Sequence, residues 1–558
     1  MKSFTRSFIT FALFNLSRSS STFKWPNPLL NYADRQLYEG PLNSVVLGCP
    51  SRDNSTLPAQ WLRLAYHDMA THNVDDGTGG LDGSIRFELD RPQDIGQGMI
   101  DSLRDFTGGN DFVGQVQAPF FGMADIIALG AVLAVAGCGG PVVPFSAGRI
   151  DATEAGPATV PEPQQDLASH TESFRRQGFT PSEMIALVAC GHTLGGVRQV
   201  DFPLVVTDNA TVVQSFDSTP AFDTAVVSEY LQNTTRNILV VGPNVTTRSD
   251  FRIFSSDGNA TMQSLLSPDT FDTTCASLLE RMINTVPSNV KLTDPITQPF
   301  EYLVTDPMFA IRDGSLFMAT ALRVRHIIVT YILEQRADIF RKVLSSNPAR
   351  TVTLFWTDRR GSSCPPNGCS AQPHFSQGVT FTVIGTKQGV TAQRFSFNAT
   401  INSTASISKF WFEINENDGS EPITVDNSGT GFVIDQDSVF VDIGRIKSGF
   451  IGSPGVSGDV TELVVAIRGD STSFSNASVS SFVPSSNGEP PFSPTIEVSN
   501  LELDTTNAPD GGYIFLTTNI STQTTFSDVT ATLAGGAVTA KNFDVNAALR
   551  VISSAAFP

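Results

Sequence analysis

The sequence is poor in positively charged residues and contains no long apolar run. Lysine and arginine together number 36 against 55 aspartate and glutamate residues, so the formal net charge at pH 7 is −19. Nucleic acids and anionic membranes repel so acidic a chain, and we expect neither as a partner. No stretch is apolar over the ~20 residues that a bilayer-spanning helix needs, so we also expect no membrane span.

Residues 1–21 carry the features of a secretory signal peptide. Basic residues precede a short apolar run at residues 8–16, and small residues follow it. Sequons for N-linked glycans are spread along the whole chain. They begin at Asn54, Asn209, Asn233, Asn244, Asn259, Asn398, Asn402, Asn476 and Asn519. We therefore expect a secreted, extracellular glycoprotein, in which disulfide bonds are stable.

A chain of 558 residues is too long for one hydrophobic core, so we expect more than one domain. The pattern of apolar residues changes near residue 290. Before that point apolar residues recur at helical spacing, as in residues 123–136 and 184–194. After it, β-branched and aromatic segments alternate with clusters of Gly, Asn, Asp and Ser. These strand candidates are residues 351–356, 379–384, 410–414, 440–443 and 463–467.

The fold class that we predict is multidomain. A mainly α-helical domain covers residues 22–290, and an all-β, sandwich-like domain covers residues 291–558. Residues 324–344 have a helical pattern that interrupts the series of strands.

The segment WLRLAYHD at residues 61–68 places an arginine and a histidine four residues apart. On a helix, Arg63 and His67 project from one face about a turn from each other. A neutral imidazole beside a guanidinium suits the cleavage of a peroxide. The imidazole moves a proton from one oxygen to the other, and the fixed positive charge stabilises the leaving hydroxide. An isolated pair at this spacing also occurs by chance on a helix surface, so the surrounding sequence decides.

Residues with oxygen donors follow this pair closely. Asp68, Asp82 and Ser84 offer side-chain oxygens and Gly80 offers a carbonyl. Such hard ligands suit Ca²⁺ better than a soft transition metal. Taken alone, Asp82-Gly-Ser84 is also an ordinary turn sequence.

Four pieces of the sequence together resemble the plant, fungal and bacterial haem peroxidase superfamily. They are RLAYHD at residues 63–68, GGLDGSIRFE at 79–88, FSAGRIDA at 145–152 and VACGHTLGG at 188–196. The resemblance covers roughly residues 25–290. It implies a haem b enzyme that reduces hydrogen peroxide and then oxidises small aromatic reductants in two one-electron steps. It also implies a fungal source, because fungal-type calcium loops occur beside a SIRFE segment nearer to the intracellular class.

The resemblance gives the haem-facing residues their roles. Arg63 and His67 would be the distal catalytic pair, and His192 would be the ligand of the haem iron. Phe216 would lie near the proximal haem face. Tyr66 takes the place of the usual distal Phe or Trp, either as an aromatic wall or as a phenol that can be oxidised.

The iron ligand also needs a hydrogen-bond acceptor that fixes its tautomer and makes it more electron-donating. The segment at residues 252–257 resembles the one that supplies this aspartate in the family. Asp257 is the residue that we predict, and Asp250 is the weaker candidate.

Two calcium sites are implied as well. The distal ligands would be Asp68, Gly80, Asp82 and Ser84. The proximal ligands, in a loop similar to that of secreted members of the family, would be Thr193, Asp217, Thr219 and Asp223.

Asp94 stands where the superfamily usually has an asparagine that accepts a hydrogen bond from the distal histidine. We hypothesise that ionised Asp94 takes part in catalysis by raising the pKa of His67, because a negative neighbour favours the imidazolium. Less neutral base would then be present in acid.

The specialised oxidation sites of the family are missing. Thr56, Gln60 and Arg198 hold the positions of the acidic residues of manganese peroxidases. Leu187 holds the position of the exposed tryptophan of lignin-type enzymes, and Asp201 that of the arginine of ascorbate peroxidase. We therefore expect small phenols or dyes as reductants.

The cysteines yield two expected pairings and one expected free thiol. The resemblance pairs Cys49 with Cys138, and Cys364 and Cys369 are close enough in sequence for a local bridge. Cys190 lies in an apolar run, where we expect a buried free thiol, and the sequence identifies no partner for Cys275.

Two other functions are compatible with parts of the sequence. The β domain could bind cell-wall polysaccharide or a protein while the helical half serves as a degenerate, non-catalytic scaffold. Retention of Arg63, His67, His192 and Asp257 argues against degeneracy. A calcium-dependent adhesin without haem would explain the acidic loops but not the two histidine-bearing helices. Fold class alone does not assign a function to the β domain.

Overall fold

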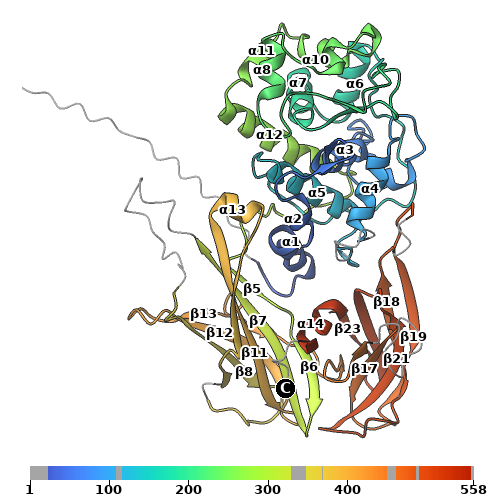
Figure 1. Ribbon diagram of the computed structural model, residues 1–558. Coiled ribbons are helices and arrows are strands. Elements are labelled where there is room, and N and C mark those ends of the chain that lie inside the picture. The colour runs from blue at the N-terminus through green and yellow to red at the C-terminus, as the bar shows by residue number, and fades with distance from the viewer. Residues whose placement is uncertain are drawn as a thin grey trace, which may run out of the picture.

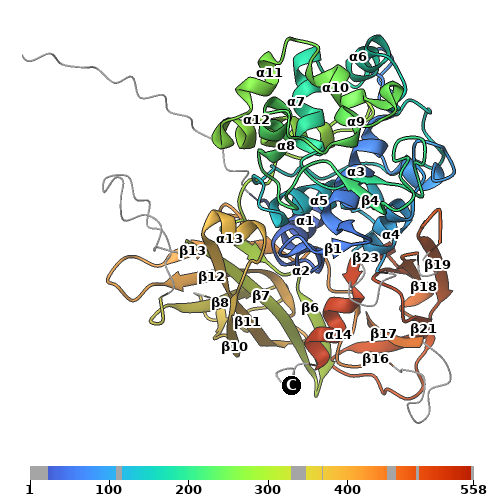
Figure 2. The same ribbon diagram turned by 45° about the horizontal axis from the view of Figure 1, so that its top comes forward.

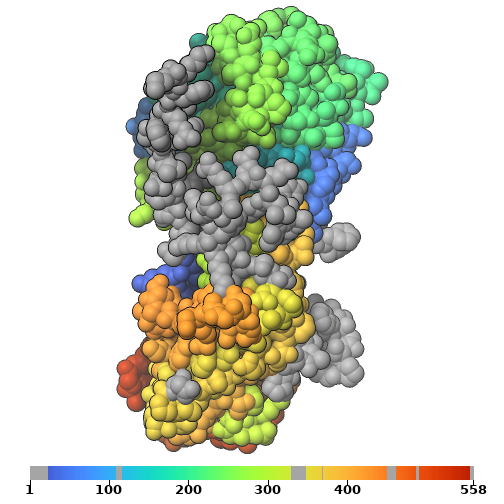
Figure 3. All heavy atoms as spheres, turned by 90° about the vertical axis from the view of Figure 1, so that its left-hand side faces the viewer, coloured from blue at the N-terminus to red at the C-terminus, as the bar shows by residue number. Residues whose placement is uncertain are grey.

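The protein is described by a computed structural model that covers residues 23–108, 116–327, 347–366, 368–448, 460–485 and 489–553. A helical part and a β-rich part lie end to end (Figure 1), and the division is also visible in the space-filling view (Figure 3). The signal peptide predicted at residues 1–21 lies outside the described residues. No described helix is long and apolar enough to cross a membrane.

The helical part holds most of the helices, with two short hairpins between them. The α-helices are α1 Pro28–Glu39, α2 Leu42–Val46, α3 Leu57–Met69, α4 Gln97–Phe106, α5 Met123–Gly137, α6 Leu167–Arg176, α7 Pro181–Gly191, α8 Ala225–Leu231, α9 Ile238–Val241, α10 Ser249–Phe254, α11 Ala260–Ser264 and α12 Pro268–Ile283. The 3₁₀ helices are η1 Ser84–Phe87 and η2 Val245–Thr247. The hairpins pair β1 Ser51–Arg52 with β2 Ser55–Thr56, and β3 Gly196–Arg198 with β4 Val213–Ser215.

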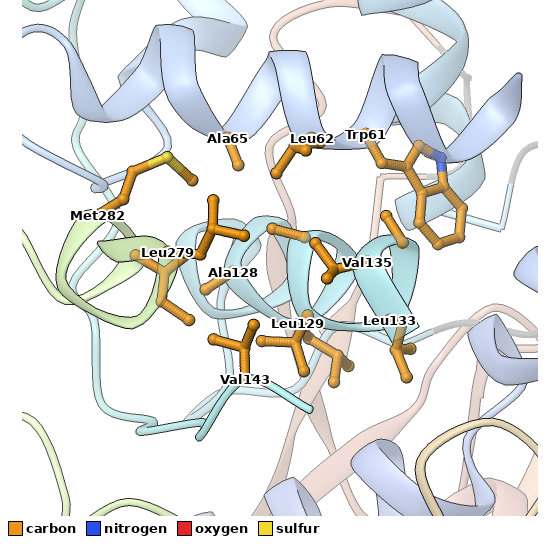
Figure 4. Packing of buried hydrophobic residues seen from close by; sticks show 14 of the residues in the cluster. Trp61, Leu62, Ala65, Ala128, Leu129, Leu133, Val135, Val143, Leu279 and Met282 are labelled. Carbon is orange, nitrogen blue, oxygen red and sulfur yellow. The ribbon is translucent and has the colours of Figure 1, made fainter. Parts of the chain in front are cut away.

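Helix α3 is anchored on α5, which is buried along most of its length and is apolar apart from Asp125. Thr56 caps the start of α3 by accepting a hydrogen bond from the backbone N–H of Ala59 at 3.3 Å. Trp61 and Leu62 of α3 point toward α5, and Met282 of α12 packs beside this contact (Figure 4). Burying each such large side chain contributes about 1.5–3 kcal/mol. One face of α3 is thereby fixed to the core, which sets the direction of its polar face.

Helix α7 is held at both ends. Thr180 and Glu183 form a reciprocal capping box at its start. Near its end a disulfide joins Cys190 to Cys275 of α12, with the two Cα atoms 5.5 Å apart. The prediction of a free thiol at Cys190 was therefore wrong. The sequence could not pair these residues, because their contact depends on the packing of α7 against α12.

The two expected disulfides are confirmed. Cys49 bonds to Cys138, and Cys364 bonds to Cys369. The first joins the loop before α3 to the end of α5.

Within the described residues, the β-rich part contains four antiparallel sheets. The first is built from β5 Tyr302–Val304, β6 Met308–Arg312, β7 Ser315–Ile327, β10 Phe375–Val379 and β11 Val390–Asn402. The second is built from β8 Thr351–Asp358, β9 Cys369–Ala371, β12 Ile407–Asn415, β13 Ile423–Val425 and β14 Phe432–Val433. The third is built from β15 Val439–Val441, β16 Lys447–Ser448, β17 Val460–Arg468, β20 Glu502–Leu503 and β21 Tyr513–Ser521. The fourth is built from β18 Phe474–Val483, β19 Thr495–Asn500, β22 Phe526–Leu533 and β23 Gly536–Asp544.

These sheets form two packed pairs where the sequence had predicted a single sandwich. Alternate residues of β7 and β11 share one apolar core with alternate residues of β8 and β12. A second core lies between the sheet that contains β17 and β21 and the sheet that contains β18 and β22. Alternation identifies the buried face of each strand, but it does not tell which sheet covers that face.

Two local predictions also need correction. Residues 379–384 are not a strand: β10 ends at Val379, and the short helix α13 Ile384–Gln388 follows after a loop. Residues 324–327 complete strand β7 and are not helical, while the rest of the segment predicted as helix lies outside the described residues. A second short helix, α14 Val545–Ser553, follows β23.

The helical and β-rich parts share one core. Phe381, Phe492 and Phe526 belong to the same apolar cluster as α5. Helix α1 lies at the border (Figure 2), where Arg323 of β7 pairs with Asp34 at 2.6 Å and with Glu39 at 2.7 Å. The arginine and Asp34 are almost fully buried. The β-rich part is therefore docked firmly to the helical part.

Candidate functional site

Two histidines at the ends of α3 and α7 form the centre of the site. His67 lies in the last turn of α3, and His192 directly follows the last residue of α7. They are close enough for charge on His192 to lower the pKa of His67. Each ring is held at Nδ1 by a different buried aspartate.

One loop positions both distal side chains. Nδ1 of His67 lies 2.8 Å from Oδ1 of Asp94, which is fully buried. The Nη2 group of Arg63 donates to the carbonyls of Gln93 and Ile95, each at 3.2 Å. The structure thus brings Arg63, His67 and Asp94 together, and the expected contact between Asp94 and His67 is present. Because the carbonyls come from the neighbours of Asp94, a shift of this loop would move the arginine and the histidine together.

The electrostatic balance at His67 combines opposing causes. Burial, followed by the charge of Arg63, lowers the pKa of His67 to about 4. Asp94 acts in the opposite direction, as predicted, but does not outweigh the causes that lower the pKa. Burial also lowers the pKa of the Arg63 guanidinium to about 10, while Asp94 and Asp201 oppose that change.

Tyr66 forms part of the wall beside the distal pair. Its ring meets that of His67 edge-on, with centroids 6.0 Å apart, and stacks on Phe174 at 6.0 Å. Its hydroxyl lies 3.5 Å from Oε1 of Gln177, and burial raises the pKa of its phenol. The position suits an aromatic wall. Oxidation of the phenol stays a prediction.

The proximal histidine is paired with Asp250 and not with Asp257. Nδ1 of His192 lies 2.7 Å from Oδ2 of Asp250, a nearly fully buried residue in the first turn of α10. Asp257 is exposed and accepts hydrogen bonds from the N–H and hydroxyl of Thr261, at 2.9 and 2.6 Å. The assignment to Asp257 was therefore wrong. Asp257 lies in the turn that follows α10, where its carboxylate stabilises the start of α11.

Two further contacts complete the proximal side. The ring of Phe216 stacks on that of His192, with centroids 4.2 Å apart and planes 14° apart. Phe216 therefore lies against the proximal histidine, as expected. Asn237 donates from Nδ2 to Oδ2 of Asp250 at 2.7 Å. Sequence reasoning missed Asn237, because it lies in an irregular segment between α8 and α9.

The proximal residues fit a haem ligand. Asp250 occupies Nδ1 of His192, which leaves Nε2 as the nitrogen able to bind a metal. The His192 side chain is 32% exposed although Asp250 behind it is 1% exposed, so the ring opens away from the core. An imidazole fixed in this way is the ligand type found in peroxidases.

The four predicted proximal calcium ligands lie together. Thr193 donates from Oγ1 to the carbonyl of Asp223 at 2.7 Å, and Thr219 donates to Oδ2 of Asp223 at 3.0 Å. Oδ2 of Asp217 is buried and has no hydrogen-bond partner among the described residues. Burial raises the pKa of Asp217 to about 7. An oxygen-only set with an unpartnered buried carboxylate oxygen fits Ca²⁺.

The distal calcium residues also lie together, but their oxygens are partly used. Asp68 accepts hydrogen bonds from the N–H groups of Gly83 and Ile85, at 2.7 and 2.9 Å. Asp82 accepts one from the N–H of Ser84 at 3.1 Å. Within the described ranges, no group of three or more His, Cys, Asp or Glu side chains is arranged to hold a metal. Both calcium sites stay predictions.

The positions of the family's specialised oxidation sites hold other interactions. Thr56 caps α3, and Gln60 accepts a hydrogen bond from Arg52 at 2.5 Å. Arg198 pairs with Asp201 at 3.5 Å. None of these three positions offers a carboxylate for Mn²⁺.

Comparison with known proteins places residues 47–275 under the family model described as Peroxidase. A WSC domain-containing protein from Arthroderma benhamiae is 38% identical over 329 residues, which are 56% of this chain and 41% of that protein. The putative L-ascorbate peroxidase 6 of Arabidopsis thaliana is 38% identical over 135 residues, 24% of this chain and 40% of that protein.

Mitochondrial cytochrome c peroxidase from Yarrowia lipolytica is 32% identical over 140 residues, 24% of this chain and 39% of that protein. The chain thus spans less than half the length of these relatives. The family match covers the segment that carries Arg63, His67, His192 and Asp250. Residues 47–275 therefore form a domain of the haem peroxidase superfamily.

Proposed function

We propose that the protein is a secreted haem peroxidase that reduces hydrogen peroxide and oxidises small phenols or dyes. The observation that carries the proposal is the pair of neighbouring histidines, each held at Nδ1 by a buried aspartate, with Arg63 one turn from His67. Haem b bound at His192 would supply the redox chemistry. The family match supports the same activity.

The distal residues would handle the proton and the charge. Because the Asp94 carboxylate accepts a hydrogen bond from Nδ1 of His67, Nε2 is the nitrogen without a proton. The low pKa of His67, about 4, keeps this base neutral over most of the pH range. Nε2 can take a proton from one peroxide oxygen and return it to the other. Arg63 stays positively charged and stabilises the negative charge that develops on the leaving oxygen.

The reductants that we propose are small and aromatic. The positions that bind Mn²⁺ in manganese peroxidases hold Thr56, Gln60 and Arg198, and Leu187 is a buried aliphatic residue. Two bound Ca²⁺ ions, N-linked glycans and an extracellular location complete the proposal. They rest on the oxygen-rich loops, the sequons and the N-terminal residues of the sequence.

The test is expression of the full chain with haemin, followed by an absorption spectrum and a peroxide assay. We expect a Soret band and peroxide-dependent oxidation of a phenol and a dye, with little turnover of Mn²⁺ or ascorbate. His192→Ala should lose the Soret band, while His374→Ala, which alters an exposed histidine of the β-rich part, should keep it. A wild-type protein without a Soret band would contradict the proposal.

A second activity, binding of cell-wall polysaccharide, is favoured by one feature of the β-rich part. Phe355 of β8 and Trp411 of β12 lie opposite each other, with rings 5.7 Å apart and nearly parallel. Both are partly exposed on the outer face, because their neighbours in sequence face the core. Flat aromatic faces can pack against the C–H faces of sugar rings, and nearby polar groups such as Thr353 and Gln372 can bind sugar hydroxyls.

Co-sedimentation with insoluble chitin and β-glucan tests this second activity. Trp411→Ala should reduce the bound fraction, whereas Phe375→Ala, which removes an exposed aromatic ring from β10, should not. Equal binding by the two variants would contradict a role for this face. Binding together with an inactive haem site would favour the non-catalytic scaffold.

A further inference from the structure

The carboxylate behind the proximal histidine is shared among three donors. Oδ2 of Asp250 accepts a hydrogen bond from Nδ1 of His192 and another from Nδ2 of Asn237, both at 2.7 Å. Oδ1 of Asp250 lies 3.2 Å from the hydroxyl of Ser249. Asp250, Asn237 and Ser249 are all buried. The amide and the imidazole therefore compete for the same oxygen in a site with little water.

The orientation of the Asn237 amide is fixed by a second interaction. Its Oδ1 accepts a hydrogen bond from the N–H of Leu239 at 2.9 Å and so caps α9. The backbone N–H of Asn237 donates to the hydroxyl of Thr235 at 3.1 Å. Since the amide oxygen is used at the helix start, the NH₂ group is the part that faces Asp250. The contact with Asp250 is therefore a donated hydrogen bond, and rotation of the amide by 180° would break both interactions.

We infer that Asn237 is a positioning residue that acts through Asp250 to limit the electron donation of His192 to the haem iron. The inference rests on the proposed function in so far as it concerns the iron. A carboxylate oxygen that already accepts one strong hydrogen bond carries less negative charge toward a second donor. Asn237 thus weakens the pull of Asp250 on the Nδ1 proton of His192. A less polarised imidazole donates less charge to a metal bound at Nε2.

The partners of Asp250 determine the direction of the effect. Removing the amide donor leaves more of the Oδ2 charge for Nδ1 of His192, so the imidazole becomes the stronger donor. The Fe(III)/Fe(II) potential should then become more negative, because the oxidised iron is stabilised by a more electron-rich ligand. Removing the hydroxyl of Ser249 should act in the same direction but less, because its hydrogen bond is longer and reaches the other oxygen.

Asn237→Ser is the variant that separates this role from helix capping. A serine hydroxyl still accepts a hydrogen bond from the N–H of Leu239, but it is too short to donate to Asp250. Ser249→Ala is a second variant that leaves α9 untouched. Thr235→Val is the matched control, because it removes a hydroxyl that holds the backbone of Asn237 and does not contact Asp250.

Three measurements test the inference. In the haem-free protein, the NMR resonance of the Nδ1 proton of His192 should move downfield in Asn237→Ser, because its hydrogen bond to Asp250 becomes stronger. In the haem-loaded protein, the midpoint potential should shift to a more negative value and the Fe–His stretching frequency should rise. Ser249→Ala should move each readout less, and Thr235→Val should leave them unchanged.

The outcomes keep the two hypotheses apart. An unmoved Nδ1 proton resonance in Asn237→Ser would overturn the inference, whether or not haem binds. An unmoved potential in the presence of a normal Soret band would also overturn it. A shifted resonance in a protein that never acquires a Soret band would support the link between Asn237 and His192 and contradict the proposed peroxidase. In an Asp250→Asn background, Asn237→Ser should have no further effect on the potential.

Discussion

The two histidine–aspartate pairs of the helical part share one geometry and differ in their neighbours. In both, Nδ1 of the imidazole lies within 2.8 Å of a buried carboxylate. Beside His67 is the guanidinium of Arg63, whereas His192 is stacked on the apolar ring of Phe216. A pair of the same kind can thus serve as a base on one side and as a metal ligand on the other, because the neighbouring residues decide its chemistry.

The carboxylates differ as well. Asp250 accepts hydrogen bonds from His192, Asn237 and Ser249. Oδ2 of Asp94 is buried and has no hydrogen-bond partner within the part of the chain that the structure describes. The charge of Asp94 is therefore directed mainly at His67 and Arg63, while that of Asp250 is divided.

The largest expected effect comes from removing the distal base. His67→Ala should slow the reaction with hydrogen peroxide by roughly 10²–10⁴-fold, because no group then transfers the proton between the peroxide oxygens. The Soret band should remain, since His192 is unchanged. Stopped-flow absorbance measures the rate, and His374→Ala serves as the control. A variant that keeps the wild-type rate would show that the two pairs do not divide the roles as proposed.

Breaking the proximal pair should have the next largest effect, and on binding more than on proton transfer. Asp250→Ala should weaken haem affinity by roughly 10–100-fold, because His192 loses the acceptor that orients its ring. Haemin titration followed by the Soret absorbance measures this loss. Unchanged affinity would mean that Asp250 is not the acceptor that matters.

Asp94→Asn should produce a smaller change, confined to acid. Neutral His67 is the active form, so the rate falls as pH drops through its pKa, which is about 4. Asp94 raises that pKa, although burial and Arg63 keep it low. Its neutralisation should therefore move the acid limb of the pH–rate profile to lower pH. Asp201→Asn, which alters a carboxylate facing Arg63, is the control; a limb that stays in place in Asp94→Asn would contradict the assignment.

The smallest effect is expected at the residue that the sequence favoured wrongly. Asp257→Ala should leave the Soret band and haem affinity unchanged, because Asp257 contacts Thr261 and not His192. It should lower the free energy of unfolding by about 1 kcal/mol, because the first turn of α11 loses the hydrogen bonds from Thr261 to Asp257. Thermal unfolding measures this change. A loss of haem as large as that in Asp250→Ala would restore the original assignment.

Much of the helical part could be predicted from the sequence, because its evidence is local. The pair Arg63 and His67 lies on one helix turn, and Asp94 could be placed by its motif. Asp250 and Asp257 lie seven residues apart in the same segment, and only the end of α10 between them decides which one faces the core. The sequence has no local signal for that end.

The missed features depend on contacts between distant segments. Cys190 and Cys275 are separated by 85 residues and meet because α7 packs on α12. The presence of two sandwiches could not be predicted from the sequence either, because the pattern of a strand identifies its buried face and not the sheet that covers that face. Residues 379–384 are apolar like a strand, but Phe381 and Ile384 are buried against the helical part instead of in a sheet.

The core shared by helices and sheets bears on how the chain folds. Residue 290 separates two textures of sequence, but the apolar cluster and the ion pair of Arg323 with Asp34 cross that border. If the helical half stood alone, Asp34 would lose its partner, and breaking a buried pair of this kind costs roughly 3–5 kcal/mol. The apolar surface of the helical half that Phe381 and Phe492 cover would also face water. The change in sequence pattern near residue 290 therefore does not separate two independent folding units, and the two halves should unfold together.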